Sequence, residues 1–250
     1  MQWVVERPLA WLIAYGDSIA SQDHTTSFYA AVAKRLEGMP IAYITGRQAF
    51  WSLELEVTPA VLIPRADTET LVEAALKRIP QDQPSSVLDL GTGSGAIALS
   101  LAKERASAQI TAIDKSPAAL AVAIRNAERL GIDSIIWLES DWLSAVTTQR
   151  FDCVVSNPPY VAANDPHLQQ DGLPFEPDVA LIGRDDGLGD IKHIIEHARS
   201  VLRPGGWLLI EHGFDQGEAV TSLFEHYSYN DIRRHKDLNQ QNRCTEGRLP

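Results

Sequence analysis

The 250-residue chain has only two cysteines, Cys153 and Cys244, which lie far apart in the sequence. Two cysteines so placed indicate neither a disulfide framework nor a cysteine-based zinc site. The N-terminal sequence lacks the basic region and apolar core of a signal peptide. No apolar run approaches the ~20 residues that a membrane helix needs. These absences favour a cytoplasmic protein without a membrane segment.

Positive charge is also scarce, because 22 lysines and arginines stand against 33 acidic residues, for a net charge of −11. Enzymes that act on nucleic acids usually carry a basic patch for the phosphates. The basic residues here are scattered, apart from Arg233, Arg234 and Lys236. We therefore expect no direct nucleic-acid binding, and favour a protein or small-molecule substrate.

The seven histidines offer no convincing metal-ligand spacing. Only His193 and His197 lie four residues apart on a predicted helix, and no acidic ligand pattern flanks them. A metal site formed by two histidines four residues apart on a helix needs such an acidic residue nearby. We therefore predict no metal site.

From residue 85 onward, strand and helix patterns alternate, which predicts a mostly parallel sheet with helices on both faces. We expect a seven-stranded α/β domain over residues 65–250. Glycines and prolines predict a turn at 203–206 and a long loop at 161–187, and loops of this length are usually functional or disordered. The expected strands are 87–90, 110–114, 135–138, 151–155, 207–211, 229–236 and 243–249. The expected helices follow residue 95 and cover 117–130, 188–202 and 215–226.

The chain before this domain has a different pattern. Residues 1–38 show apolar residues at helical spacing, and polar residues from Asp17 to Asp23 predict a turn between two helices. Alternation over 39–64 predicts a β-hairpin linker. Asp67 is a suitable N-cap for the helix that opens the large domain.

The stretch Asn157-Pro158-Pro159-Tyr160 follows a short β-branched and aromatic run that predicts a buried strand, 151–155. The prolines end the strand, because proline cannot donate a ladder hydrogen bond, and they stiffen the loop. Open α/β sheets bind ligands at the carboxyl ends of their strands. The Asn157 side chain and a backbone carbonyl could therefore offer two fixed acceptors to a planar NH₂ group, although the tripeptide alone also suits a simple stiff turn.

A second motif, Asp89-Leu90-Gly91-Thr92-Gly93-Ser94-Gly95, connects an apolar strand to a helix of small residues. Glycines allow the backbone to approach a ligand closely, and the helix N-terminus offers free N–H groups. Gly91, Gly93 and Ala96 fit a dinucleotide-binding domain. Asp89 with the three glycines also fits methyltransferases that use S-adenosylmethionine, and Asn157 to Tyr160 favour that second interpretation.

Polar residues at the ends of neighbouring strands complete the predicted site. Asp114, at the end of the second strand, is placed to accept the ribose hydroxyls of an adenosine moiety, or else to cap a helix. After the third strand, Asp141 could accept from the adenine amine while Trp142 covers the ring, or Trp142 could be core. Asp89 could meet the charged methionine end of the cofactor or brace the turn.

With these motifs in place, the chain resembles, essentially from end to end, the HemK/PrmC family of peptide-chain release factor glutamine methyltransferases. The run Gly38-Met39-Pro40-Ile41-Ala42-Tyr43-Ile44-Thr45-Gly46 is especially typical of that family. So are Phe50-Trp51, Ile63-Pro64-Arg65, Asp67-Thr68-Glu69 and Phe175-Glu176-Pro177, in combination with the two motifs above.

The resemblance implies a class I, Rossmann-like methyltransferase and transfer of the S-adenosylmethionine methyl to the glutamine amide in the Gly-Gly-Gln motif of release factors. It implies cofactor contacts from Gly91 to Gly95, Asp114, Trp142 and Asn157, and a substrate-amide site from Asn157 to Tyr160. Residues 1–38 would form a substrate-docking domain that is shorter here than in the family. The protein would be a monomer. We hypothesise that the Asn157 side-chain oxygen and the Pro158 carbonyl accept the amide hydrogens while Tyr160 packs beside the amide.

Three alternatives remain open from the residues. A nucleic-acid exocyclic-amine methyltransferase shares the Asn157 motif but needs a basic groove. A nicotinamide-dependent dehydrogenase shares the glycine turn but gives Asn157 to Tyr160 no role. A binding protein that retains the fold without catalysis is the third, and the intact motifs argue against it.

Overall fold

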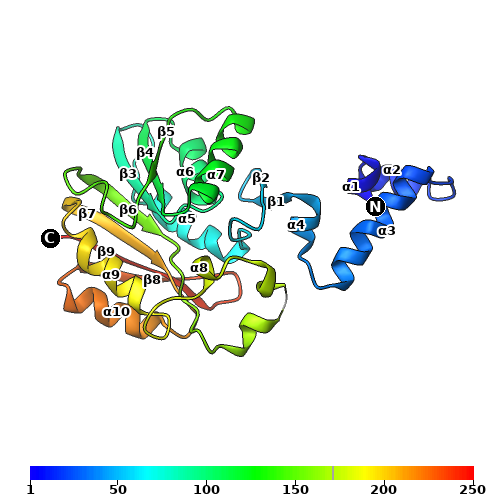
Figure 1. Cartoon of the computed structure of the whole chain (residues 1–250). Helices are drawn as coiled ribbons and strands as arrows, with labels where there is room; N and C mark the ends of the chain where they lie inside the picture. Colours follow the sequence, from blue (N-terminus) through cyan, green and yellow to red (C-terminus); the bar gives the residue numbers. More distant parts are fainter. Residues whose placement is uncertain (171) are drawn as a thin grey trace.

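The computed structural model describes residues 1–170 and 172–250. Its N-terminal helices stand apart from a larger α/β unit (Figure 1), and every residue of these helices is at least partly exposed. They are α1 (Gln2–Val5), α2 (Leu9–Ala14) and α3 (Gln22–Leu36). The turn before α3 was predicted, but the helix expected ahead of it is divided. Pro8, with extended backbone, separates α1 from α2, because proline disrupts a helix interior.

The linker is only partly a hairpin. Strands β1 (Arg47–Phe50) and β2 (Leu53–Glu56) pair antiparallel. The prediction of strand structure before Gly46 was wrong, because Ile41–Thr45 form the short helix α4. The Pro40 carbonyl accepts the first turn's N–H groups, and Gly46 ends the helix in the left-handed conformation (φ 72°).

The predicted seven-stranded, mostly parallel sheet is confirmed. Its strand order is β5-β4-β3-β6-β7-β9-β8. The first five of these are parallel to one another, and β9 lies antiparallel between β7 and β8. The strands are β3 (Ser85–Leu90), β4 (Ala108–Asp114), β5 (Ile135–Glu139), β6 (Phe151–Ser156), β7 (Leu202–Glu211), β8 (Asn230–Lys236) and β9 (Asn242–Arg248).

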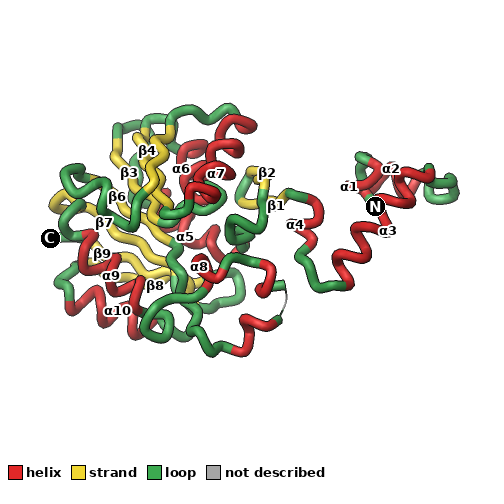
Figure 2. The backbone as a smooth tube through the Cα atoms, viewed as in Figure 1, coloured by secondary structure: helices red, strands yellow, loops and turns green. Residues whose placement is uncertain are grey.

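Helices cover both faces of the sheet (Figures 1 and 2). One face packs with α5 (Glu69–Leu76), α6 (Ala96–Glu104) and α7 (Pro117–Leu130). The other packs with α9 (Gly189–Ala198) and α10 (Gly217–His226). The loop predicted at 161–187 contains, apart from residue 171, two 3₁₀ turns (Pro166–Gln169 and Leu173–Phe175) and α8 (Asp178–Leu181). Among the described residues, no helix is both long and apolar enough to cross a bilayer.

Local capping signals explain α7 but not α5. The Ser116 hydroxyl accepts the Ala119 N–H (3.2 Å) at the start of α7, and Gly131 ends the helix with φ 66°, as predicted. The expectation that Asp67 caps α5 was wrong. Residues Ala66–Thr68 already form a 3₁₀ turn. Asp67 instead pairs with Arg243 (Oδ2 to Nη2, 3.0 Å), which comes from β9.

Two predicted boundaries near β7 also moved. Helix α9 ends at Ala198, and the turn expected at 203–206 lies inside β7. Phe151 pairs with Leu202 while Cys153 pairs with Trp207, so the extra residues of β7 form an irregularity in the ladder. The Phe151 N–H also donates to the Val201 carbonyl (2.8 Å), and this contact keeps the strand paired before the glycines.

The hairpin is attached to the α/β unit through Asn126, a fully buried residue of α7. Its Oδ1 accepts the Glu56 N–H (2.6 Å), and its Nδ2 donates to the carbonyls of Glu56 and Ser94 (3.0 Å each). One amide therefore connects β2, α7 and the glycine turn, which fixes the linker against the site described next.

Candidate active site

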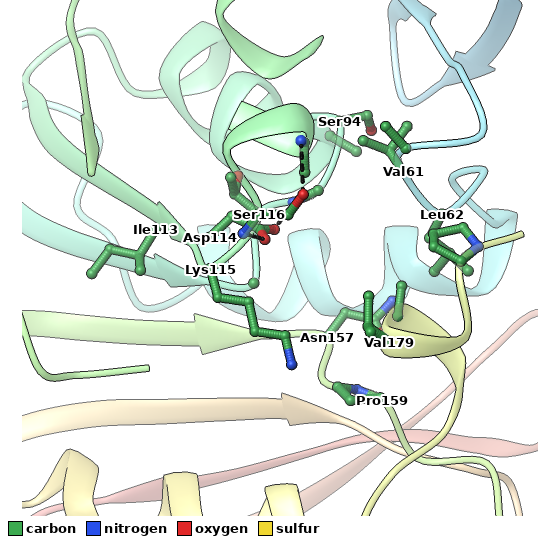
Figure 3. A pocket seen from close by; sticks show the side chains of 18 of the residues that line it. Val61, Leu62, Ser94, Ile113, Asp114, Lys115, Ser116, Asn157, Pro159 and Val179 are labelled. Carbon is green, nitrogen blue, oxygen red and sulfur yellow. Dashed lines mark hydrogen bonds between the residues drawn. The ribbon is translucent and has the colours of Figure 1, made fainter. Parts of the chain in front are cut away.

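A cavity opens at the carboxyl ends of the central strands. The chain runs from β3 to β4 on one side and later returns to β6 on the other, so this is the topological switch point where open α/β sheets bind ligands. Figure 3 shows Asp114 and Lys115 on the β4 side, and Asn157 with Pro159 on the β6 side. Residues from six segments line the cavity: 60–68, 91–97, 113–119, 140–142, 157–159 and 177–180.

The glycine turn forms one wall of the cavity through Gly91, Thr92, Gly93 and Ser94. Gly93 has φ 56°, and a Cβ built on it would have no described atom within 4 Å, so its surface faces open space. Gly95 does not line the cavity. It precedes α6 with φ 84°, and a Cβ there would meet Leu99 (3.0 Å).

Asp89 lies beneath the turn and is completely buried. Its Oδ2 accepts the Thr92 hydroxyl (2.7 Å) and the Ala98 N–H (3.2 Å), so it braces the turn against α6. Burial raises the pKa of the Asp89 carboxyl to about 7. Its Oδ1 has no hydrogen-bond partner among the described residues. Direct contact between Asp89 and a ligand stays a prediction.

Asp114 faces the cavity from the end of β4. Its Oδ2 accepts the Gly93 N–H and its Oδ1 accepts the Ser116 N–H, each at 2.9 Å. Burial raises the pKa of this carboxyl above its ordinary value. Each oxygen keeps a further lone pair, so the carboxylate can accept hydroxyl groups from a ligand in a fixed orientation.

Asp141 and Trp142 also line the cavity. Trp142 has φ 47°, an uncommon conformation for a bulky residue, which costs about 1–3 kcal/mol and persists only where neighbours enforce it. The Ser140 hydroxyl donates to the Trp142 carbonyl and accepts the Ala145 N–H, each at 3.0 Å. A Cβ on Gly91 would lie 3.9 Å from the Trp142 ring, at ordinary van der Waals distance, so Gly91 and Trp142 lie side by side in the wall of the cavity.

The Asn157 motif lies across the cavity from the turn, and Asn157 and Pro159 line it. The Asn157 Nδ2 donates to the Thr68 hydroxyl (3.2 Å). Pro158 is buried, and Tyr160 does not line the cavity. The Tyr160 hydroxyl instead donates to the buried Glu211 (3.3 Å). Contact between Tyr160 and a substrate stays a prediction.

Two further segments form walls of the cavity, and their residues were not predicted to belong to the site. Segment 60–64 and segment 177–180 both line the cavity, and buried Glu176 joins them. Its Oε2 accepts the Ile63 N–H (2.9 Å), and its Oε1 pairs with Arg65. The available signal was the family pattern, because Ile63-Pro64-Arg65 and Phe175-Glu176-Pro177 are parts of the motifs named above.

Outside the cavity, His193 and His197 stack with ring centroids 4.3 Å apart, and the His197 Nδ1 lies 2.9 Å from the His193 carbonyl. Over residues 1–170 and 172–250, no group of three or more histidine, cysteine or acidic side chains is arranged to hold a metal ion.

Comparisons with known proteins identify the family. Residues 66–170 match a "Methyltransferase small domain" model, and residues 1–46 match a "PrmC N-terminal domain" model. The release factor glutamine methyltransferase of Escherichia coli K12 is 48% identical over 248 residues, covering 99% of this chain and 89% of that protein. The one from Salmonella typhimurium LT2 is 46% identical over 249 residues, covering 100% and 90%.

A crystal structure of a methyltransferase from Pyrococcus furiosus has the same fold, with a TM-score of 0.59 at 18% identity, over 87% of this chain and 96% of that one. The fold is therefore that of the class I methyltransferases. The relatives favour the methyltransferase interpretation of the glycine turn over the dehydrogenase one. Because near-half identity extends over almost the whole chain, the chain belongs to the family of release factor glutamine methyltransferases.

Proposed function

We propose that this chain transfers the methyl group of S-adenosylmethionine to the side-chain amide nitrogen of the glutamine in the Gly-Gly-Gln motif of peptide-chain release factors. Two relatives named for that activity support the proposal. The observation that carries it is the single cavity that Gly93 and Asp114 share with Asn157. Gly93 and Asp114, which suit an adenosine moiety, thus face the Asn157 side chain, which can accept a hydrogen bond from a substrate amide.

The cofactor fits the residues present. Gly93 leaves open the space that a Cβ would fill, so the backbone can approach the ligand closely. The braced Asp114 carboxylate accepts the ribose hydroxyls, and Asp141 with Trp142 takes the adenine. S-adenosylmethionine, when bound, supplies a methyl group on a sulfonium, which is electrophilic.

The chain must compensate for a weak nucleophile, because the amide nitrogen lone pair is delocalised into its carbonyl. Since the Asn157 Nδ2 is already bonded to Thr68, the Oδ1 is the atom left to accept a hydrogen from the substrate amide. The Pro158 carbonyl accepts the second hydrogen. These two acceptors orient the nitrogen and favour its pyramidalisation, and the proton leaves after the methyl is transferred.

The remaining parts of the proposal concern the partner. Residues 1–38 act as the docking domain for the release factor, and 39–64 connect it to the catalytic unit at 65–250. The enzyme acts as a monomer in the cytoplasm, where translation takes place, and does not need to bind nucleic acid.

The test is methyl transfer from labelled S-adenosylmethionine to purified release factor. A release factor with the Gly-Gly-Gln glutamine replaced is the matched control, and a nucleic-acid sample is the second. We expect label on the intact factor alone. Label on the replaced factor would contradict the glutamine as the site, and label on nucleic acid would favour the exocyclic-amine alternative.

A further inference from the structure

The residues between the docking helices and the hairpin make contacts that no step described so far uses. Figure 1 shows that α1, α2 and α3 stand apart from the α/β unit, with α4 between them and it. The direction of these helices relative to the cavity therefore depends on residues 38–43, which we call the joint. A partner that touches both the helices and the cavity needs that direction to be fixed.

The joint is attached first to the end of α3. Gly38 follows this helix with a left-handed backbone (φ 97°). The Arg35 Nη1, from the last turn of α3, donates to the carbonyls of Gly38 (3.1 Å) and Met39 (3.3 Å). The Met39 N–H in turn donates to the Lys34 carbonyl (3.2 Å). These hydrogen bonds hold the end of α3 in one orientation relative to the start of the joint.

The joint also packs on the cavity wall that precedes α5. Ala42, in α4, is buried in an apolar cluster with Val61 and Ile63. The Tyr43 hydroxyl donates to the Val61 carbonyl (2.6 Å). Val61 itself lines the cavity. The far end of the joint is therefore fixed to a residue that bounds the candidate active site.

A third set of contacts fixes the start of the joint to the opposite wall. A Cβ built on Gly38 would lie 3.4 Å from Cε2 of the Phe175 ring, so this ring covers Gly38. A Cβ on Gly172 would lie only 2.7 Å from Cγ of the Pro40 ring, so this close approach requires glycine. Phe175 comes just before residues 177–180, which line the cavity. Both walls thus hold the joint.

We propose that Phe175 is a positioning residue for the protein substrate. Its ring on Gly38, together with the contact between Gly172 and Pro40, holds the docking helices in one direction relative to the cavity. A release factor bound to these helices then presents its glutamine to Asn157. This inference rests on the proposed function, because it takes residues 1–38 as the docking domain.

The positioning role distinguishes a whole release factor from a short peptide. Two linked contact regions on one partner can raise its affinity by about 10²–10⁴-fold, and this gain is lost when the geometry prevents both from engaging. A short peptide that contains Gly-Gly-Gln reaches the cavity alone. The joint should therefore affect the KM of the whole factor and leave that of the peptide unchanged.

Two variants disturb the joint in opposite ways. Phe175→Ala removes the ring, and Gly172→Ala adds a Cβ where the Pro40 ring lies. We expect both to raise the KM for release factor about 10–100-fold. The kcat should not change, since the contact supports the ground state and the transition state equally. The kcat/KM for the peptide and the calorimetric S-adenosylmethionine Kd should stay within about twofold, because the cavity residues are unaltered.

Three further variants control for other effects. Phe175→Met keeps a long apolar side chain against Gly38 and should recover a KM close to that of the wild type. Gly131→Ala has similar backbone strain (φ 66°) without a described atom within 4 Å of the new Cβ. Ile136→Ala truncates an exposed apolar residue of β5. The last two should leave the KM for release factor unchanged.

Two kinetic results would overturn the positioning role. One is an unchanged KM for release factor in both Phe175→Ala and Gly172→Ala. The other is an equal loss with release factor and with peptide, because the variants would then act through the cavity itself. A KM in Phe175→Met as high as that in Phe175→Ala would also contradict an apolar contact at Gly38.

A measurement without turnover separates this inference from the proposed function. Both native cysteines are buried, so spin labels can be directed to Ile13→Cys on α2 and Glu128→Cys on α7, which are exposed positions. The distance distribution between the labels should be narrow in the otherwise unchanged protein and with Phe175→Met, and broad with Phe175→Ala. Equal widths in all three would refute the positioning role. A narrow distribution that broadens with Phe175→Ala, without methyl transfer to release factor, would refute only the substrate.

Discussion

Two glycines of this chain separate the effect of backbone strain from the effect of a blocked cradle. Gly93 (φ 56°) lines the cavity, and Gly131 (φ 66°) ends α7 outside it. A Cβ on either would have no described atom within 4 Å. Substitution of either glycine by alanine therefore costs only the left-handed conformation, about 1–2 kcal/mol of unfolding free energy.

The two variants should differ in cofactor binding. In Gly93→Ala the added methyl occupies the space in which the cofactor would lie against the backbone. We therefore expect the S-adenosylmethionine Kd to rise at least about 100-fold, or about 2.7 kcal/mol. Gly131→Ala should bind like the wild type. Urea unfolding measures the strain, and calorimetric titration measures the affinity. If Gly93→Ala bound the cofactor as tightly as Gly131→Ala, the cavity would not be the cofactor site.

Three further predictions test other contacts. Asn157→Ala should lower kcat about 10²–10³-fold, by analogy with the loss of one oxyanion-hole donor, with an unchanged cofactor Kd; normal turnover would disprove the acceptor role. Glu176→Gln keeps an acceptor for the Ile63 N–H but loses the charge facing the partly exposed Arg65. This variant should lose about 1–3 kcal/mol of unfolding free energy in urea and bind the cofactor more weakly. No change in either quantity would mean that Glu176 does not fix segments 60–64 and 177–180 at the cavity. Arg78→Met should cost about 3–5 kcal/mol, because it removes the guanidinium paired with the buried Glu246 and leaves only His235 beside that carboxylate. Although burial opposes it, the nearby His235 ring and the hydrogen bonds from Arg78 lower the Glu246 pKa to about 2. The stability from this carboxylate is thus present above pH 4.5 and lost as the pH falls toward 2. In Arg78→Met, the free energy of unfolding should therefore depend less on pH between 4.5 and 2.

The parts of the structure that were predictable depend on local signals. Ser116 and Gly131 mark the ends of α7 by their own backbone preferences, and the glycine turn follows a strand with apolar residues at Val87, Leu88 and Leu90. Asp114 and Asn157 could be expected at one site because both follow parallel strands, whose carboxyl ends meet at one edge of the sheet.

The parts that were missed depend on partners far along the chain. The apolar residues of α4 are too few for their period to distinguish helix from strand. Asp67 suits an N-cap by sequence, yet its ion pair with Arg243 exists only once β9 is in place. Glu211 ends a buried strand, which was a usable signal, but its hydrogen bond from Tyr160 requires knowing that β7 lies beside β6.

The position of β9 has a consequence for how the protein is made. Residues 242–248 pair with β7 on one side and β8 on the other, so they fill an interior place in the sheet although they follow all the other strands in synthesis. Until they emerge from the ribosome, β7 keeps an open, apolar edge, and such edges promote aggregation of incomplete chains. Arg243 also has to be synthesised before it can form its ion pair with Asp67. A growing chain therefore carries both sequence motifs long before it can assemble a supported active site.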